Sequence, residues 1–468
     1  MYYILSLQPI ILLLNIGIVT ILDGLIPFRI ESKVYELGLV VVLEFILVYT
    51  SNLKIRSKNN AFMSRRDFYS LLLISVSLFV LFSLLVSPVN LYLTSGDGNA
   101  HLSVLNDIKM YKQEIFHHVY FDNSQKILQI GNFYPRASHY LGNIITVENA
   151  SNSLIYYYLM ILSFSLFWPT VLYQLIKLYT NSRLSISILL FLLTLNIFPL
   201  GLIYTSNLSS IYGVIVAVGG FVLLENLVFS KQVFKFFSII VFSSVIALYH
   251  PSAIFTFAFL FILNYFFAAR EYSFKLTGYL RFIILIIVLL FLVFTKLRNE
   301  LDTYFSSMPI NYKSLNDLVP LLFNFDVIQP YLVQYYNLSF YSSLFMVPNF
   351  FFILCIILLN GYKRFFSFIS LFIYLLIITS TFFAGFERPL SWISLLGIMY
   401  YQSPIRIAHL GIIVYALIVI SYVIYNKNLN LFSLRKYTFF QFFMFIYLLI
   451  WTYLSLTKSF QLPLNSLS

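Results

Sequence analysis

The chain has 468 residues, of which 60% are hydrophobic and 10% are charged, and its formal net charge is +12. Soluble globular domains carry about 25% charged residues, so this composition excludes an ordinary soluble domain. The positive charge alone would fit nucleic-acid binding, but the positions of the charges along the chain favour a different explanation, given below.

Apolar runs of membrane-spanning length recur along the whole chain. A helix needs about 20 apolar residues to cross a hydrocarbon core of about 30 Å. The sequence therefore predicts an all-α polytopic membrane protein, and the first run is interpreted as a retained span rather than a cleaved signal. The runs predict about thirteen transmembrane helices, at residues 3–27, 34–53, 68–88, 152–176, 184–200, 208–229, 236–249, 252–268, 282–295, 331–359, 365–383, 405–425 and 437–456.

Lysine and arginine in the short connections predict the orientation. With a cytoplasmic N-terminus, 17 of the 29 Lys and Arg residues fall in cytoplasmic segments and 5 fall in short outer segments. Short cytoplasmic loops are enriched in Lys and Arg, so this distribution favours that orientation. The net positive charge is then explained by the orientation of the chain in the membrane and by attraction to anionic lipid. Nucleic-acid binding is not predicted. Two long polar segments, 89–151 and 296–330, are placed on the extracytoplasmic face.

Near its start, the first long outer segment reads "SGDGNAHLSVLNDIKMYKQEIF". Asp97 lies between two glycines, and the residues that follow it predict an amphipathic helix in the membrane interface. Asp97 and His101 are four residues apart and share a face if the helix begins there. One interpretation is a catalytic carboxylate with a neighbouring histidine. The other is that Asp97 caps the helix N-terminus, where a carboxylate is favourable.

The same segment ends with "GNFYPRASHYLGNII", which can begin the next helix after Pro135. Arg136 and His139 are three residues apart, and with Tyr134 they form a set suited to binding a phosphate or a sugar hydroxyl. The alternative is an ordinary solvated loop with interfacial tyrosines.

Later outer-face residues complete the predicted site. His250 precedes a proline between two short spans, in "ALYHPSAIF", where a structural histidine is the alternative. Arg388 occurs in "FERPLSW", and Tyr401 and Arg406 occur in "YYQSPIRIAHL". Because Arg406 begins inside an apolar run, its cation should face a protein interior or cavity, which makes it a functional candidate.

These stretches together resemble a bacterial family of multi-spanning membrane proteins grouped with the GT-C superfamily of glycosyltransferases. The resemblance rests on an Asp in the first large outer loop, "YPRASHYL", the central His-Pro, and "YYQSPIRIAHL" before a late span. It covers roughly residues 68–425. Two predicted spans precede the one that leads to Asp97, and they are interpreted as an addition to the superfamily core.

The resemblance implies a GT-C-like bundle and an inverting glycosyltransferase that uses a polyprenyl-phosphate or diphosphate sugar donor. It implies that Asp97 is the general base for a glycan or glycolipid acceptor on the outer face of the cell membrane. The residues predicted to bind substrate are His101, Tyr134, Arg136, His139, His250, Arg388, Tyr401 and Arg406. No cofactor is predicted, and no metal, although Asp97, His101 and His139 could form a metal site.

The predicted organisation has three parts. Residues 1–67 hold the two extra spans and a basic cytoplasmic loop, 68–425 hold the GT-C-like core, and 426–468 hold the last cytoplasmic loop, last span and outer tail. Two alternatives to a sugar transferase stay open, a polymerase of polysaccharide repeat units and a flippase for lipid-linked oligosaccharides. A flippase favours cations near the membrane midplane and internal pseudo-symmetry, and the sequence shows neither pattern.

Overall fold

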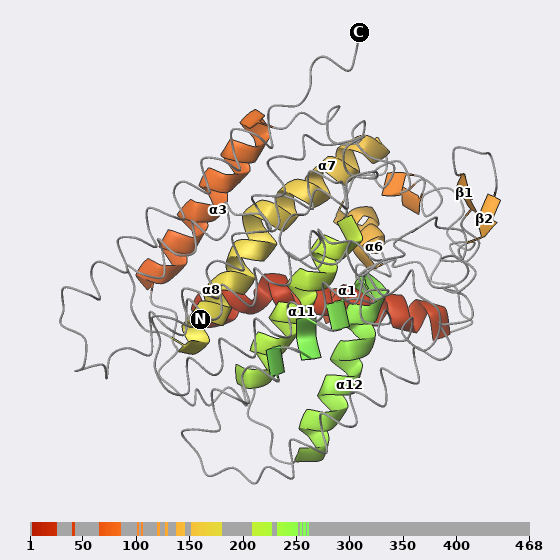
Figure 1. Ribbon diagram of the computed structural model, residues 1–468. Helices are drawn as coiled ribbons and strands as arrows, with labels where there is room; N and C mark the ends of the chain where they lie inside the picture. The colour runs from red at the N-terminus through yellow and green to blue at the C-terminus, as the bar shows by residue number, and fades with distance from the viewer. Residues whose placement is uncertain are drawn as a thin grey trace, which may run out of the picture. The chain divides into compact units, whose positions relative to one another are not determined.

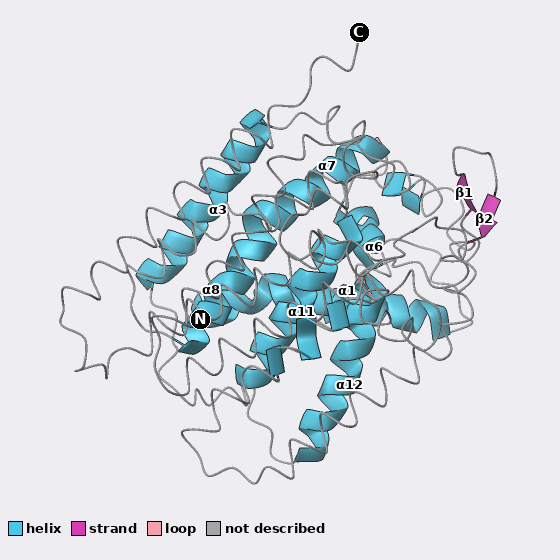
Figure 2. Ribbon diagram, viewed as in Figure 1, coloured by secondary structure: helices cyan, strands magenta, loops and turns pink. Residues whose placement is uncertain are grey.

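The computed structural model describes part of the chain, almost all of it within one compact unit that includes Met1–Phe257. The described residues are 2–25, 40–42, 65–85, 101–102, 104–105, 119–121, 127–129, 137–145, 151–179, 208–226, 232–250, 253–254, 256–258 and 260–261. Helices dominate these residues (Figures 1 and 2). Six predicted spans lie outside the described residues: 184–200, 282–295, 331–359, 365–383, 405–425 and 437–456. The number thirteen therefore stays a prediction.

The described long helices match the apolar runs closely. They are α1 (Tyr2–Leu25), α3 (Arg65–Leu85), α7 (Asn152–Leu162) with α8 (Trp168–Tyr179), α11 (Leu208–Asn226) and α12 (Gln232–Tyr249). A short helix, α6 (Ala137–Ile145), precedes α7. The prediction of a helix near "RASHYLGNII" is confirmed, but α6 is a helix of its own because Ser151 starts α7 anew, accepting a hydrogen bond from the Leu154 amide through its side chain.

Among the described residues, three helices are long and apolar enough to cross a membrane, within Asp67–Leu84, Asn152–Leu175 and Leu208–Asn226. Their surroundings differ. In α3, Asp67, Leu71, Ser75, Leu78 and Phe82 are buried, and they recur at helical spacing on one face. The opposite face exposes large apolar side chains, as suits contact with lipid: Tyr69, Leu72, Leu73, Val76, Phe79, Val80 and Leu84. By contrast, α11 is buried on nearly all sides, as expected for a helix that is apolar all round.

Helix α11 packs against α12, α8, α1 and α6, and α3 packs against α7 and α8. Helix α1 crosses α12 at a steep angle (Figure 1), and the Tyr249 hydroxyl donates to the Leu13 carbonyl over 2.7 Å. The first helix therefore belongs to the same packed core as the helices near the predicted site.

Helices α7 and α8 form one continuous rod through a π-helical turn, Ser163–Phe167 (Figure 1). The cause is in the sequence, because Pro169 lacks an amide proton and its ring clashes with the carbonyl of the residue four positions earlier. Widening the preceding turn relieves that clash. Ser163 and Ser165 donate their hydroxyls to the carbonyls of Met160 and Ile161, over 2.7 and 2.6 Å.

Two short strands depart from the prediction of an all-helical chain. Strands β1 (Val119–Phe121) and β2 (Ile127–Gln129) pair antiparallel, with Tyr120 opposite Leu128 (Figure 2). Both contain β-branched, aromatic or large aliphatic residues, and the intervening "DNSQK" begins with turn-forming residues. The prediction missed this hairpin because each strand is only three residues long.

Candidate functional site

Two predicted site residues, His101 and His139, meet inside the protein. His101 lies in a short helical segment of the first outer loop, and His139 lies in the first turn of α6. Nδ1 of His101 is 2.9 Å from Nε2 of His139, and the ring centroids are 5.0 Å apart. Both side chains are buried, at 3% and 0% exposure. A hydrogen bond between imidazoles requires one ring to donate and the other to accept, so each ring controls the tautomer of the other.

Two serines extend this pair toward α11. The Ser138 hydroxyl is 3.5 Å from Nδ1 of His139 and 3.3 Å from the hydroxyl of Ser209, in the first turn of α11. Ser138 and Ser209 are both buried. We call His101, Ser138, His139 and Ser209 the histidine–serine cluster. It joins the loop segment, α6 and α11, so segments far apart in sequence share one polar centre.

Aromatic and apolar packing holds the histidine–serine cluster in place. The ring of Tyr156, on α7, stacks on His101 with centroids 6.0 Å apart and planes 24° apart. At Gly142, a Cβ atom would lie 2.9 Å from Leu159 and 3.3 Å from Leu105. This glycine therefore lets α6 approach both α7 and the segment of His101 closely.

His250 ends α12 beside the same face of α11. Its amide donates to the Ile246 carbonyl over 2.9 Å, and its own carbonyl accepts from the Ala253 amide over 3.0 Å. Pro251 follows and cannot continue the hydrogen-bond ladder. The Cβ of His250 packs over Gly213, which is one helical turn after Ser209 on the same face of α11. The structure thus places His250 at the same end of α11 as the histidine–serine cluster.

The other predicted site residues lie outside the described residues: Asp97, Tyr134, Arg136, Arg388, Tyr401 and Arg406. The predicted outer loop 296–330 also lies outside them. Residues 101–102 and 104–105 are helical, as predicted for the segment after Asp97, with Leu105 buried and Leu102 partly exposed. The interfacial placement of that helix stays a prediction.

Sequence reasoning did not select Ser138, Tyr156 or Ser209. Ser138 adjoins a predicted site residue. Ser209 and Ser210 form a polar step at the start of an otherwise apolar span, in "NLSSIYG". Such a step at the predicted outer end of a span is the signal that could have identified Ser209. Tyr156 carries no such signal, because it is one of three consecutive tyrosines at the start of α7.

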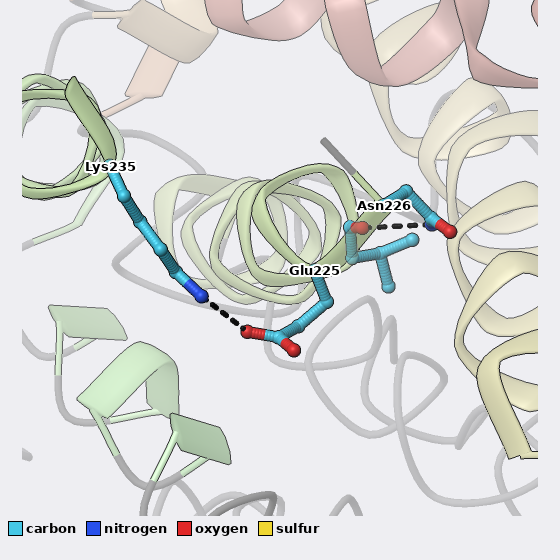
Figure 3. Close-up of polar contacts among 4 residues, drawn as sticks. Glu225, Asn226 and Lys235 are labelled. Carbon is cyan, nitrogen blue, oxygen red and sulfur yellow. Dashed lines mark hydrogen bonds and ion pairs between the residues drawn. The ribbon is translucent and has the colours of Figure 1, made fainter. Parts of the chain in front are cut away.

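Charged side chains gather at the opposite helix ends. Asp67 and Lys177 join the start of α3 to the end of α8, with Nζ and Oδ2 3.7 Å apart. Glu225 and Lys235 join the end of α11 to the start of α12 over 3.3 Å, and Asn226 donates to the carbonyl of Val222 (Figure 3). Within the described ranges, every Lys and Arg is at these ends, and none is at the end that holds the histidine–serine cluster: Arg65, Arg66, Lys177 and Lys235.

The described part thus defines a helical protein with spans suited to a membrane, with its described Lys and Arg residues at one end of the helices and the histidine–serine cluster at the other. Comparison with protein-family models, with curated proteins and with solved structures finds no match to the chain. Among the described residues, no group of three or more His, Cys, Asp or Glu side chains is placed to hold a metal ion.

The orientation can be tested by labelling single cysteines at the two ends. In a Cys355→Ser background, we expect a membrane-impermeant maleimide to label Ser151→Cys in intact spheroplasts. Arg65→Cys should be labelled only after lysis, because Arg65 is exposed at the basic end, which is expected to be cytoplasmic. Loss of the Ser151 cap should cost about 1 kcal/mol, which a folded span can tolerate. The reverse labelling pattern would overturn the predicted orientation.

Proposed function

We propose that this protein is an inverting membrane glycosyltransferase of the cell envelope. It transfers a sugar from a polyprenyl-phosphate or diphosphate donor to a glycan or glycolipid acceptor at the extracytoplasmic face of the cell membrane. The observation that carries the proposal is the meeting of His101 and His139, two separately predicted outer-loop residues, in one polar cluster. That cluster lies at the helix ends remote from the basic residues, as an extracytoplasmic site requires.

Two members of the histidine–serine cluster are close in sequence to two charged residues of the proposal. Asp97 is four residues before His101, and Arg136 is three residues before His139. A chain extends at most about 3.6 Å per residue, so covalent connection alone limits the Cα of Asp97 to about 14 Å from that of His101. A carboxylate and a guanidinium that lie within a few residues of the cluster in sequence suit a reaction between a hydroxyl and a sugar phosphate.

In the proposed reaction, the Asp97 carboxylate takes the proton of the acceptor hydroxyl while that oxygen attacks the anomeric carbon. The bond from the anomeric carbon to the phosphate oxygen breaks, and the phosphate leaves with the electron pair. Attack from the opposite face inverts the anomeric configuration. The leaving phosphate is stable as an anion, so cationic stabilisation matters more than a general acid, and Arg406, Arg136 and Arg388 are assigned to it. Tyr134 and Tyr401 are assigned to the sugar rings.

Transport of a lipid-linked oligosaccharide is the competing proposal, and polymerisation of repeat units is a variant of the transferase. A flippase would use cations at mid-membrane depth. In the described spans, the charged side chains whose positions are given lie at helix ends: Arg65, Asp67, Lys177, Glu225 and Lys235. This placement favours the transferase.

The decisive experiment replaces Asp97 with Asn in cells that depend on this gene for surface polysaccharide. A general base contributes about 10²–10⁴-fold to rate, so we expect loss of the glycan modification and accumulation of the lipid-linked donor. The matched control is Asp122→Asn, which removes one carboxylate from the same outer loop and should leave the glycan unchanged. Both variants must reach the membrane at the wild-type level.

Unchanged glycan in Asp97→Asn cells would contradict the catalytic role and return this residue to a helix cap. Donor trapped on the cytoplasmic leaflet in cells that lack the protein would instead favour the transporter.

A further inference from the structure

We infer that the histidine–serine cluster is an acid-sensitive switch, which keeps the loop segment of His101 closed on α6 at neutral pH and releases it when both histidines are protonated. This segment, residues 101–102 and 104–105, is called the His101 segment. The inference goes beyond the proposed transferase function and does not depend on it. It agrees with the burial of the two rings, because rings that are 3% and 0% exposed are poorly placed to bind a bulky charged substrate.

The His101 segment is held against the core by one polar contact and by apolar packing. Nδ1 of His101 lies 2.9 Å from Nε2 of His139 in α6. Val104 and Leu105 are buried, at 2% and 3% exposure, and Leu105 packs beside Gly142 of α6. A change of charge at the histidine pair therefore acts directly on the surface where the segment meets α6.

The hydrogen bond between the two rings limits how many protons the closed pair can carry. One ring nitrogen must donate and the other must accept, which a neutral pair and a pair with one extra proton both allow. A second extra proton makes both nitrogens donors, so the bond is lost and two cations are left in contact. In the released state, each ring meets water and takes its own proton near about pH 6.5. Release therefore takes up one or two protons.

The described surroundings do not offset a doubly charged pair. Helices α1, α7, α11 and α12 all pack against α6. The described carboxylates, Asp67 and Glu225, lie at the basic end of the helices and pair with lysines there. The described side chains of α1, residues 7–20, include no titratable group. On the other elements, the described titratable side chains at this end are His250 and tyrosines, which are neutral where histidine titrates: Tyr140, Tyr156, Tyr157, Tyr158, Tyr212 and Tyr249.

The sign of the pH dependence follows from this proton uptake. Because the released state binds more protons, the closed state is favoured above about pH 6.5 and is lost as the pH falls. Each proton taken up changes the equilibrium between closed and released states about tenfold per pH unit. His101→Asn and His139→Gln each keep a polar atom near the bonding nitrogen but cannot take a proton. Each single variant should therefore remove one proton from the difference, and the double variant should remove the pH dependence.

The measurement is the reactivity of Val104→Cys in full-length, detergent-purified protein that also carries Cys355→Ser. The reagent is 2,2′-dithiodipyridine, which still reacts with thiols in acid. A buried thiol reacts through the open state, so its rate follows the released fraction. Dividing by the rate of Ser151→Cys, at an exposed position, removes the intrinsic pH dependence of the thiol. From about pH 6.5 to 4.5, we expect this ratio to rise about 10- to 100-fold per pH unit in the wild-type cluster.

Two controls separate local release from other effects of acid. Ala217→Cys, fully buried in α11, should stay unreactive throughout, since acid unfolding of the whole protein would expose it in parallel with Val104→Cys. His250→Asn changes a histidine at the same end but outside the cluster, and it should keep the wild-type slope.

Four results would overturn the inference. They are a pH-independent ratio in the wild-type cluster, a wild-type slope retained in the double variant, parallel exposure of Ala217→Cys, and loss of the slope in His250→Asn. If the double variant reacts at every pH because its segment no longer closes, the wild-type slope decides. A slope below about tenfold per pH unit then contradicts the switch, and a steeper one supports it.

Discussion

Replacing Lys177 with methionine is expected to lower the free energy of unfolding by about 3 kcal/mol, because it leaves the buried carboxylate of Asp67 without its cation. The side chains of Lys177 and Asp67 are only 8% and 9% exposed, so water replaces the lost partner poorly. Breaking buried pairs costs about 3–5 kcal/mol, and the low end applies because Asp67 also lies in the first turn of α3, where the helix dipole favours an anion. Denaturant unfolding of the detergent-purified protein measures the loss.

The matched control is Lys235→Met, at the other ion pair. That pair is shorter, 3.3 Å against 3.7 Å, but its side chains are 27% and 22% exposed. Exposed pairs contribute about 1 kcal/mol or less, so the shorter contact should matter less. A double variant with Asp67→Leu and Lys177→Met should recover much of the lost stability, because apolar replacement of a whole buried pair is often neutral. Equal losses in Lys177→Met and Lys235→Met would contradict the argument from burial.

Gly213→Ala is expected to destabilise the protein by about 1–3 kcal/mol, the usual cost of overpacking a core. A Cβ atom there would lie 2.5 Å from the Cβ of His250, 3.1 Å from that of Ala253 and 3.3 Å from the His250 amide nitrogen. These atoms are backbone or directly attached to it, so they cannot move aside by rotation of a side chain. The end of α12 would have to shift away from α11.

Gly220→Ala in the same helix is the control for this second prediction. Its Cβ would meet nothing closer than 3.4 Å, and the atom met there belongs to a phenylalanine ring. Alanine is favoured over glycine in a helix by about 1 kcal/mol, so this variant should be neutral or slightly stabilising. Opposite signs of the two changes in melting temperature would support close packing at Gly213. A neutral Gly213→Ala would show that His250 does not pack there.

The sequence predicted the described long helices well because hydrophobic length is a strong constraint. Each apolar run at α1, α3, α7 with α8, α11 and α12 is matched to within a few residues. Charge placement likewise anticipated that Arg65, Lys177 and Lys235 would share one end. The hairpin of β1 and β2 was missed because pairing of two three-residue strands depends on a partner that local pattern does not specify.

Sequence analysis selected His101 and His139, which meet in the described structure, but not their arrangement. His101 and His139 were selected from separate motifs, each with a different expected companion, and nothing in sequence spacing indicates that their rings meet across 38 positions. Ser209 joins them from a helix 71 positions after Ser138. Such contacts depend on how α6 packs against α11, which sequence periodicity does not determine. The assignments of Asp97, Tyr134, Arg136, Arg388, Tyr401 and Arg406 stay predictions.

The π turn at Ser163–Phe167 has a consequence for how this rod orients its two halves. One turn with an extra residue advances the helix phase by about 100°, since an α-helix has 3.6 residues per turn. The face of α7 that places Tyr156 against His101 is therefore not aligned along the rod with the face of α8 that places Lys177 near Asp67. Deleting one residue from this turn would restore the clash of Pro169 with the preceding turn and would rotate one end of the rod away from its partner. The proline thus sets the angular relation between the two ends of a single span.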